Sequence, residues 1–128
     1  KIRIFEKKPI AILLKEKNKY YLSDRIELIE FKKIKKFKDL PYIIGDQKSF
    51  KSLYDGLKKI NFPINSVKKF TLYDSNRWDL ETEDKKIIKL PPENFIKSLK
   101  NYLNFKKRDD FNEYKVFDYR IKNQLILK

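Results

Sequence analysis

The sequence predicts an α+β fold, in which a mostly antiparallel sheet carries two helices packed on one face. Several short segments alternate apolar and polar residues, which is typical of strands that bury one face. Two longer segments, at about 48–60 and 92–105, have apolar residues at helical spacing. With 128 residues, 41% of them hydrophobic, the chain is long enough for one domain with its own core.

The amino-terminal quarter is expected to form a meander of antiparallel strands. Residues 1–14 contain two strand-like segments, separated by a polar interruption that ends at Pro9. Shorter strands are predicted at 20–22 and 26–31, each after a turn. The lysine-rich segment 32–38 that follows is expected to be a solvated loop.

The first helix, predicted at 48–60, follows an extended segment at 40–45 that leads into a turn. Its apolar face consists of Phe50, Leu53, Tyr54, Leu57 and Ile60. An apolar stripe at this spacing is far more often part of a core than of a ligand site. A strand at about 67–72 is expected to follow the helix.

A hairpin of two strands is predicted next, at 77–82 and 86–90. In its first strand Trp78, Leu80 and Thr82 alternate with charged residues, so these three side chains share one face. We expect Trp78 to pack in the core rather than to act as an exposed binding residue.

The second helix and two final strands complete the prediction. The dipeptide Pro91-Pro92 stops the hairpin strand and can open the helix at 92–105, because proline suits the first helical turn. Two strands, at about 114–121 and 125–127, are expected to close the chain.

The net charge of +14 raises the alternative of a basic module that binds nucleic acid. Lysine far outnumbers arginine among the 32 basic residues, and there are only two glycines and a single alanine, Ala11. This bias is typical of an AT-rich genome, which can generate the charge without selection for a polyanion. No RNA-binding aromatic motif or basic recognition helix is recognisable, so we expect no nucleic acid partner.

The residue types restrict the chemistry. The sequence contains no histidine and no cysteine, which excludes the usual zinc sites, the common nucleophile systems and disulfides. The adjacent pair Asp109-Asp110 could suggest acid–base catalysis, but it lies in a charged connection without a recognisable partner. We therefore expect no enzyme activity, no cofactor, no metal and no small-molecule substrate.

Five blocks of residues, in order, resemble the periplasmic β-domain of the FtsQ/DivIB family of cell division proteins. They are 4–11 with its Glu-Lys-Lys-Pro run, 40–45 with Leu-Pro and a final Gly, 77–80 with the central Trp, 86–91 with its closing Leu-Pro, and 116–121 with Asp-Tyr-Arg. Each block is weak alone. Their order, with a helix before and another after the Trp hairpin, makes the resemblance specific.

The resemblance implies that the chain is part of a single-pass protein of the bacterial inner membrane. Residues 1–14 would be the last strand of a truncated POTRA domain and its exit, and 15–128 an FtsQ-type β-domain in the periplasm. The implied role is that of a scaffold that binds the division proteins FtsB and FtsL during septum formation. Another POTRA-associated assembly protein, using similar edge-strand contacts, is the remaining alternative.

The resemblance also implies a partner site at the carboxy-terminal strand. In the family, the FtsB contact involves the arginine of the terminal block and the strand after it. The residues that this assigns here are Arg120, Ile121, Asn123, Leu125, Ile126 and Leu127. An arginine can pair bidentately with a partner carboxylate, but a local ion pair with Asp118 is the equally open alternative.

Overall fold

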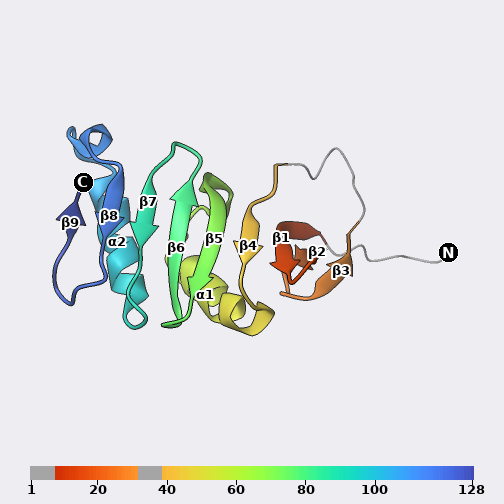
Figure 1. The fold of residues 1–128 in the computed structure, drawn as a ribbon. Helices are drawn as coiled ribbons and strands as arrows, with labels where there is room; N and C mark the ends of the chain where they lie inside the picture. Colours follow the sequence, from red (N-terminus) through yellow and green to blue (C-terminus); the bar gives the residue numbers. More distant parts are fainter. Residues whose placement is uncertain (1–7, 32–38) are drawn as a thin grey trace.

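A computed structural model describes residues 8–31 and 39–128, which form one nine-stranded sheet with two helices (Figure 1). The strands are β1 (Pro9–Lys15), β2 (Asn18–Ser23), β3 (Leu28–Glu30), β4 (Tyr42–Ile44), β5 (Val67–Tyr73), β6 (Arg77–Thr82), β7 (Ile87–Lys89), β8 (Val116–Asp118) and β9 (Ile126–Leu127). The helices are α1 (Gln47–Lys59) and α2 (Phe95–Phe105), with short 3-10 turns at Ile64–Ser66 and Phe111–Glu113.

The sheet is mixed, which corrects the prediction of a mostly antiparallel sheet. Its strand order is β3-β2-β1-β4-β5-β6-β7-β8-β9. The pairs β1–β4, β4–β5 and β7–β8 run parallel. Each helix connects two neighbouring strands, α1 between β4 and β5 and α2 between β7 and β8. A helix that crosses over between adjacent strands returns the chain in the same direction, so β4–β5 and β7–β8 must be parallel.

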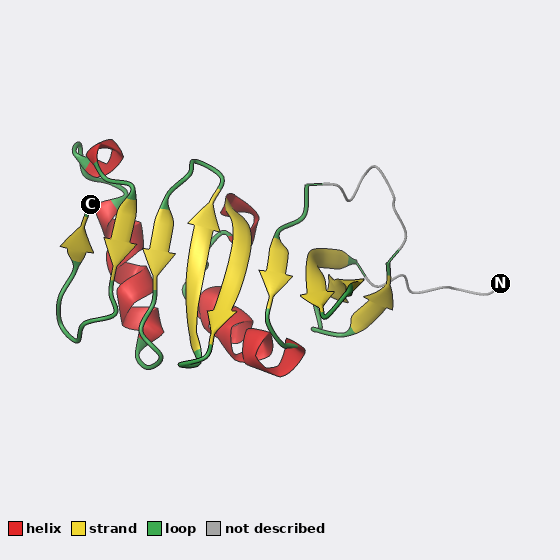
Figure 2. Ribbon diagram, viewed as in Figure 1, coloured by secondary structure: helices red, strands yellow, loops and turns green. Residues whose placement is uncertain are grey.

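Both helices lie on the same face of the sheet, as predicted (Figure 2). Helix α1 begins where Asp46 accepts a hydrogen bond from the Ser49 N–H at 2.7 Å, because aspartate is a favourable N-cap residue. The buried side chains of α1 include Phe50, Leu53 and Leu57, which confirms the predicted apolar face.

Helix α2 begins at Phe95, three residues later than predicted. Pro91 and Pro92 do not open the helix, because the backbone of Asn94 adopts the left-handed conformation with φ 59°. Residues 91–94 therefore form a separate non-helical segment beside the start of α2.

The core lies between the sheet and the two helices. Trp78 is 6% exposed and belongs to this core, as predicted. Around α2 the core is aromatic: the Phe117 ring lies 5.1 Å from Tyr102, 5.4 Å from Phe105 and 5.5 Å from Phe111 between ring centroids. Strand β8 is thereby held to the sheet from the helix side as well as by its ladder with β7.

The amino-terminal region is described only in part. The first predicted strand and the lysine-rich segment 32–38 lie outside the described residues. Strand β1 lies inside the sheet, between β2 and β4. A domain boundary after residue 14 stays a prediction. Within the described part of the chain, neither helix is long and apolar enough to cross a membrane.

Candidate functional site: the carboxy-terminal edge of the sheet

Strand β9 is the last strand at one end of the sheet (Figure 1). Its inner side pairs with β8, in a register that places Ile126 opposite Asp118 and Leu127 opposite Phe117. Among residues 8–31 and 39–128, no strand pairs with the outer side of β9. The unpaired N–H and C=O groups of an edge strand can bind an added strand from another chain.

The hydrogen bonds between β8 and β9 identify which main-chain groups face outward. Lys128 donates its N–H to the Val116 carbonyl at 3.1 Å and accepts the Val116 N–H at 3.1 Å. Antiparallel residue pairs alternate between hydrogen-bonded and non-hydrogen-bonded, so the next pair, Leu127 with Phe117, is non-hydrogen-bonded. The N–H and C=O of Leu127 therefore point toward the open side of β9.

The six residues expected at the partner site lie along this strand and the connection that precedes it. Three are exposed and lie between β8 and β9: Arg120, Ile121 and Asn123. Three are half-buried and lie at β9: Leu125, Ile126 and Leu127. The six residues thus lie in one segment that is also continuous in sequence. Their role in binding stays a prediction.

Arg120 forms a bidentate ion pair with Asp118, the alternative that the sequence left open. Its Nε donates to Oδ1 at 2.9 Å and its Nη2 donates to Oδ2 at 2.7 Å. The Arg120 main-chain N–H also donates to Oδ1, at 3.0 Å. The Asp118 side chain is 7% exposed and that of Arg120 is 43% exposed. The hydrogen bonds from the Arg120 side chain hold the pKa of Asp118 below its ordinary value.

The Arg120→Gln substitution is expected to make the domain more sensitive to acid. Because the folded-state pKa of Asp118 is lowered, its ionised form stabilises the fold above pH 3.8, and this stabilisation is lost as the pH falls through the folded-state pKa. Without Arg120 the pKa rises toward its ordinary value. The free energy of unfolding should therefore be lower in the variant near neutral pH, and this difference should vanish at strongly acidic pH.

Urea unfolding of both proteins at several values between about pH 2 and pH 7 measures this difference. The control is Lys122→Gln, which removes a nearby positive charge and leaves the Asp118 pair intact. A difference between Arg120→Gln and the unaltered chain that does not change with pH would contradict the assignment.

The connection between β8 and β9 turns at Asn123, whose φ of 61° lies in the left-handed region. Asparagine adopts this conformation more readily than most residues, so no glycine is required here. The Gln124 N–H donates to the Ile121 carbonyl at 3.0 Å and closes the turn. The side chain of Ile121 remains 50% exposed.

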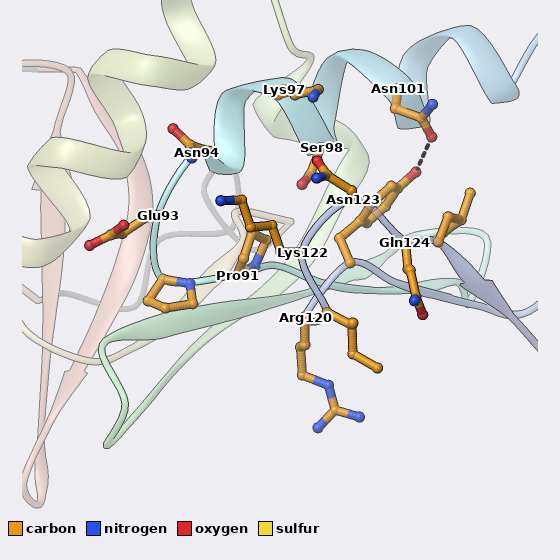
Figure 3. A pocket seen from close by; sticks show the side chains of 14 residues that line it. Pro91, Glu93, Asn94, Lys97, Ser98, Asn101, Arg120, Lys122, Asn123 and Gln124 are labelled. Atoms are coloured by element: carbon orange, nitrogen blue, oxygen red, sulfur yellow. Dashed lines mark hydrogen bonds between the residues drawn. The ribbon is translucent and has the colours of Figure 1, made fainter.

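A groove of about 530 Å³ lies beside this connection (Figure 3). One wall is formed by residues 91–94 and by α2, and the other by residues 119–125. The buried Tyr119 lies at the groove, and its hydroxyl donates to Asn101 Oδ1 at 2.8 Å. Burial raises the pKa of the Tyr119 hydroxyl, which therefore remains a neutral hydrogen-bond donor.

Lys86 is a buried residue that the sequence pattern did not single out. It is 2% exposed, and its Nζ donates to the Tyr114 carbonyl at 2.7 Å and lies 4.5 Å from the centre of the Phe111 ring. Burial lowers its pKa. These contacts fix the segment that leads into β8 against the start of β7. A lysine at an inward position of the predicted hairpin strand was the only available signal.

Among the described residues, no three acidic side chains lie close enough together to hold a metal ion. Of the acidic pair in the charged connection, Asp110 accepts hydrogen bonds from the Arg108 Nε at 2.9 Å and Nη2 at 3.0 Å. Asp110 therefore takes part in a local ion pair on the surface.

The fold and its open edge define a class of protein: an α+β domain with a mixed sheet, helices on one face and a terminal strand whose outer side pairs with no described strand. Comparison with protein families assigns the chain within this class. The family model described as cell division protein FtsQ/DivIB, C-terminal, matches residues 11–120. The chain belongs to the FtsQ/DivIB family of cell division proteins. Five of the six expected site residues, all except Arg120, lie beyond this match.

Sequence relatives agree with this assignment. The chain is 31% identical over 131 residues to the cell division protein FtsQ of Rickettsia bellii and 31% identical over 134 residues to that of Rickettsia conorii. In each case the match covers 99% of this chain and 49% of the relative, so the chain spans about half the length of these proteins.

The fold is similar to that of the major extracytoplasmic domain of the cell division protein DivIB from Geobacillus stearothermophilus, solved as its trans isomer. The TM-score is 0.51 at 15% sequence identity, over 77% of this chain and 89% of that chain. At this identity the similarity establishes the fold alone.

Proposed function

We propose that this chain is the partner-binding part of a non-catalytic divisome scaffold, which binds FtsB- and FtsL-type proteins during septum formation. The whole protein then crosses the bacterial inner membrane once and carries this region in the periplasm. In the same proposal, residues 1–14 are the end of a POTRA domain and 15–128 are the β-domain.

The observation that supports this proposal most is the open side of β9 in a protein of a cell division family. A partner segment that adds a strand there gains main-chain hydrogen bonds, beginning at Leu127, without any change in the fold. Side chains at alternate positions of the added strand would then supply selectivity. Arg120 uses Nε and Nη2 for Asp118, so its third nitrogen remains available to a partner carboxylate.

The two alternative functions are supported less well. A nucleic-acid-binding module explains the charge of +14, but it does not explain membership of a cell division family. Another POTRA-associated assembly protein would use a similar edge strand, and the family match favours a division role over it. Strong binding to nucleic acid that weakens steeply with salt would favour the first alternative.

Calorimetric titration tests the proposal. The chain is titrated with the extracytoplasmic segments of FtsB- and FtsL-type proteins. We expect saturable binding to the FtsB-type segment that is lost when residues 121–128 are deleted. Circular dichroism of the shortened chain is the control for folding. Unchanged affinity of a folded shortened chain would contradict the assigned site.

A further inference from the structure

We propose that the groove beside the β8–β9 connection binds an acidic, extended segment of the same partner, adjoining the strand that pairs with β9. This inference rests on the proposed function and extends it, because it adds a second contact on the helix side of the sheet. It assigns the occupant by chemistry: a peptide segment that carries a carboxylate.

The groove continues directly into the edge strand. Leu125 lines the groove, and β9 begins at the next residue, Ile126. A partner chain that follows the outer side of β9 to its beginning therefore arrives at the mouth of the groove. The groove volume of about 530 Å³ lies within the range of cavities that hold small ligands, so it has room for several side chains.

The edge strand alone offers a partner few contacts. Strand β9 contains only Ile126 and Leu127, and the main-chain groups of Leu127 are the ones that face outward within it. The net contribution of a main-chain hydrogen bond to the binding free energy is small compared with the cost of association. A stable complex therefore needs an adjoining surface, and the groove is contiguous with β9.

The charges along the groove favour an acidic occupant. Lys97 on α2 and Lys122 on the connection line it, and neither ammonium forms an ion pair with another described residue. Glu93 is the single carboxylate of the lining. Arg120 adds no charge to the interior, since its guanidinium binds Asp118 and points away from α2 in Figure 3. The lysines can donate to a carboxylate, and the resulting charge-assisted bonds are stronger than neutral ones.

Neutral groups of the groove suit a peptide backbone. Asn94, Ser98 and Asn123 supply amide and hydroxyl groups that can bond to main-chain N–H and C=O groups. Pro91 and Ile121 supply apolar surface for neighbouring side chains. Figure 3 shows Asn94 and Ser98 at the first turns of α2 and Asn123 on the connection.

The test compares two double variants that change the net charge equally. Lys97→Glu with Lys122→Glu reverses the charge of the groove, whereas Lys100→Glu with Lys106→Glu reverses two exposed lysines that do not line it. Binding of the FtsB-type extracytoplasmic segment is measured by calorimetry at physiological salt. We expect the groove variant to bind at least about tenfold more weakly than the control variant. Exchanging acidic residues for lysine in the flank of the partner strand should restore its affinity.

The outcomes separate this inference from the proposed function. If the groove and control variants bind equally well and Leu127→Pro still weakens binding, the groove is not a binding site and the edge strand remains one. If the groove variant binds weakly but Leu127→Pro has no effect, the partner does not add a strand at β9, and no partner segment runs from β9 into the groove. Failure of the unaltered chain to bind the segment would overturn both proposals.

Discussion

Replacement of Leu127 by proline is expected to weaken binding of an FtsB-type segment by about ten- to one hundredfold. Proline has no N–H, so the substitution removes the outward donor of β9, and its ring obstructs the approach of an added strand. The inward bonds of β9 remain, because Lys128 and Val116 form them. Calorimetric titration of the folded variant measures the change.

The matched control is Leu127→Ala. Alanine removes most of the side chain that packs against the core but keeps the outward N–H, so the affinity should fall by much less than in Leu127→Pro. Equal losses of affinity in the two variants would show that the side chain, rather than the main-chain edge, forms the contact.

Replacement of Phe117 by alanine is expected to lower the free energy of unfolding by about 3–5 kcal/mol. Phe117 is fully buried, and its ring contacts those of Tyr102, Phe105 and Phe111. The substitution leaves a cavity between α2 and β8. Since a domain of this size is stable by only about 5–15 kcal/mol, the loss should be clear in urea unfolding.

Phe117→Leu is the control for this second prediction. Leucine fills much of the same space, so we expect a considerably smaller loss in the free energy of unfolding. Because β8 carries β9 on its outer side, Phe117→Ala should also weaken binding of the partner segment. A loss below about 1 kcal/mol in Phe117→Ala would contradict the packing described for β8.

The helices and most strands could be predicted from the sequence because their patterns are local. Helix α1 was predicted at 48–60 and lies at Gln47–Lys59, since its apolar face repeats at helical spacing and Asp46 caps it. The direction of the strands could not be predicted in the same way. Strands β4 and β7 are short, and the pattern of a strand does not state whether its neighbour runs parallel.

The start of α2 and the extent of β8 were predicted incorrectly for local reasons. The left-handed conformation of Asn94 separates the proline pair from the helix. Strand β8 ends at Asp118, although the apolar alternation continued to Ile121, because the Asp118 carboxylate accepts the Arg120 N–H and turns the chain out of the ladder. Side-chain to main-chain bonds of this kind compete with strand pairing.

The candidate site was predicted only where it is continuous in sequence. The terminal strand and Arg120 follow from the family resemblance. The ion pair between Asp118 and Arg120 follows from their positions two residues apart, which place both side chains on the same side of the predicted strand. The groove was not predicted, because it joins residues 91–101 to residues 119–125, which only the tertiary fold brings together. The buried Lys86 was missed because its carbonyl partner belongs to Tyr114.

Hydrogen exchange at the Leu127 amide, followed by NMR with and without the FtsB-type extracytoplasmic segment, tests the central claim most directly. In the free chain this N–H faces the open side of β9 and should exchange rapidly, whereas the Lys128 N–H, bonded to Val116, should exchange more slowly. Addition of the partner strand is expected to slow exchange at Leu127 by at least about tenfold. Saturating binding that leaves the exchange of Leu127 unchanged would contradict strand addition at β9.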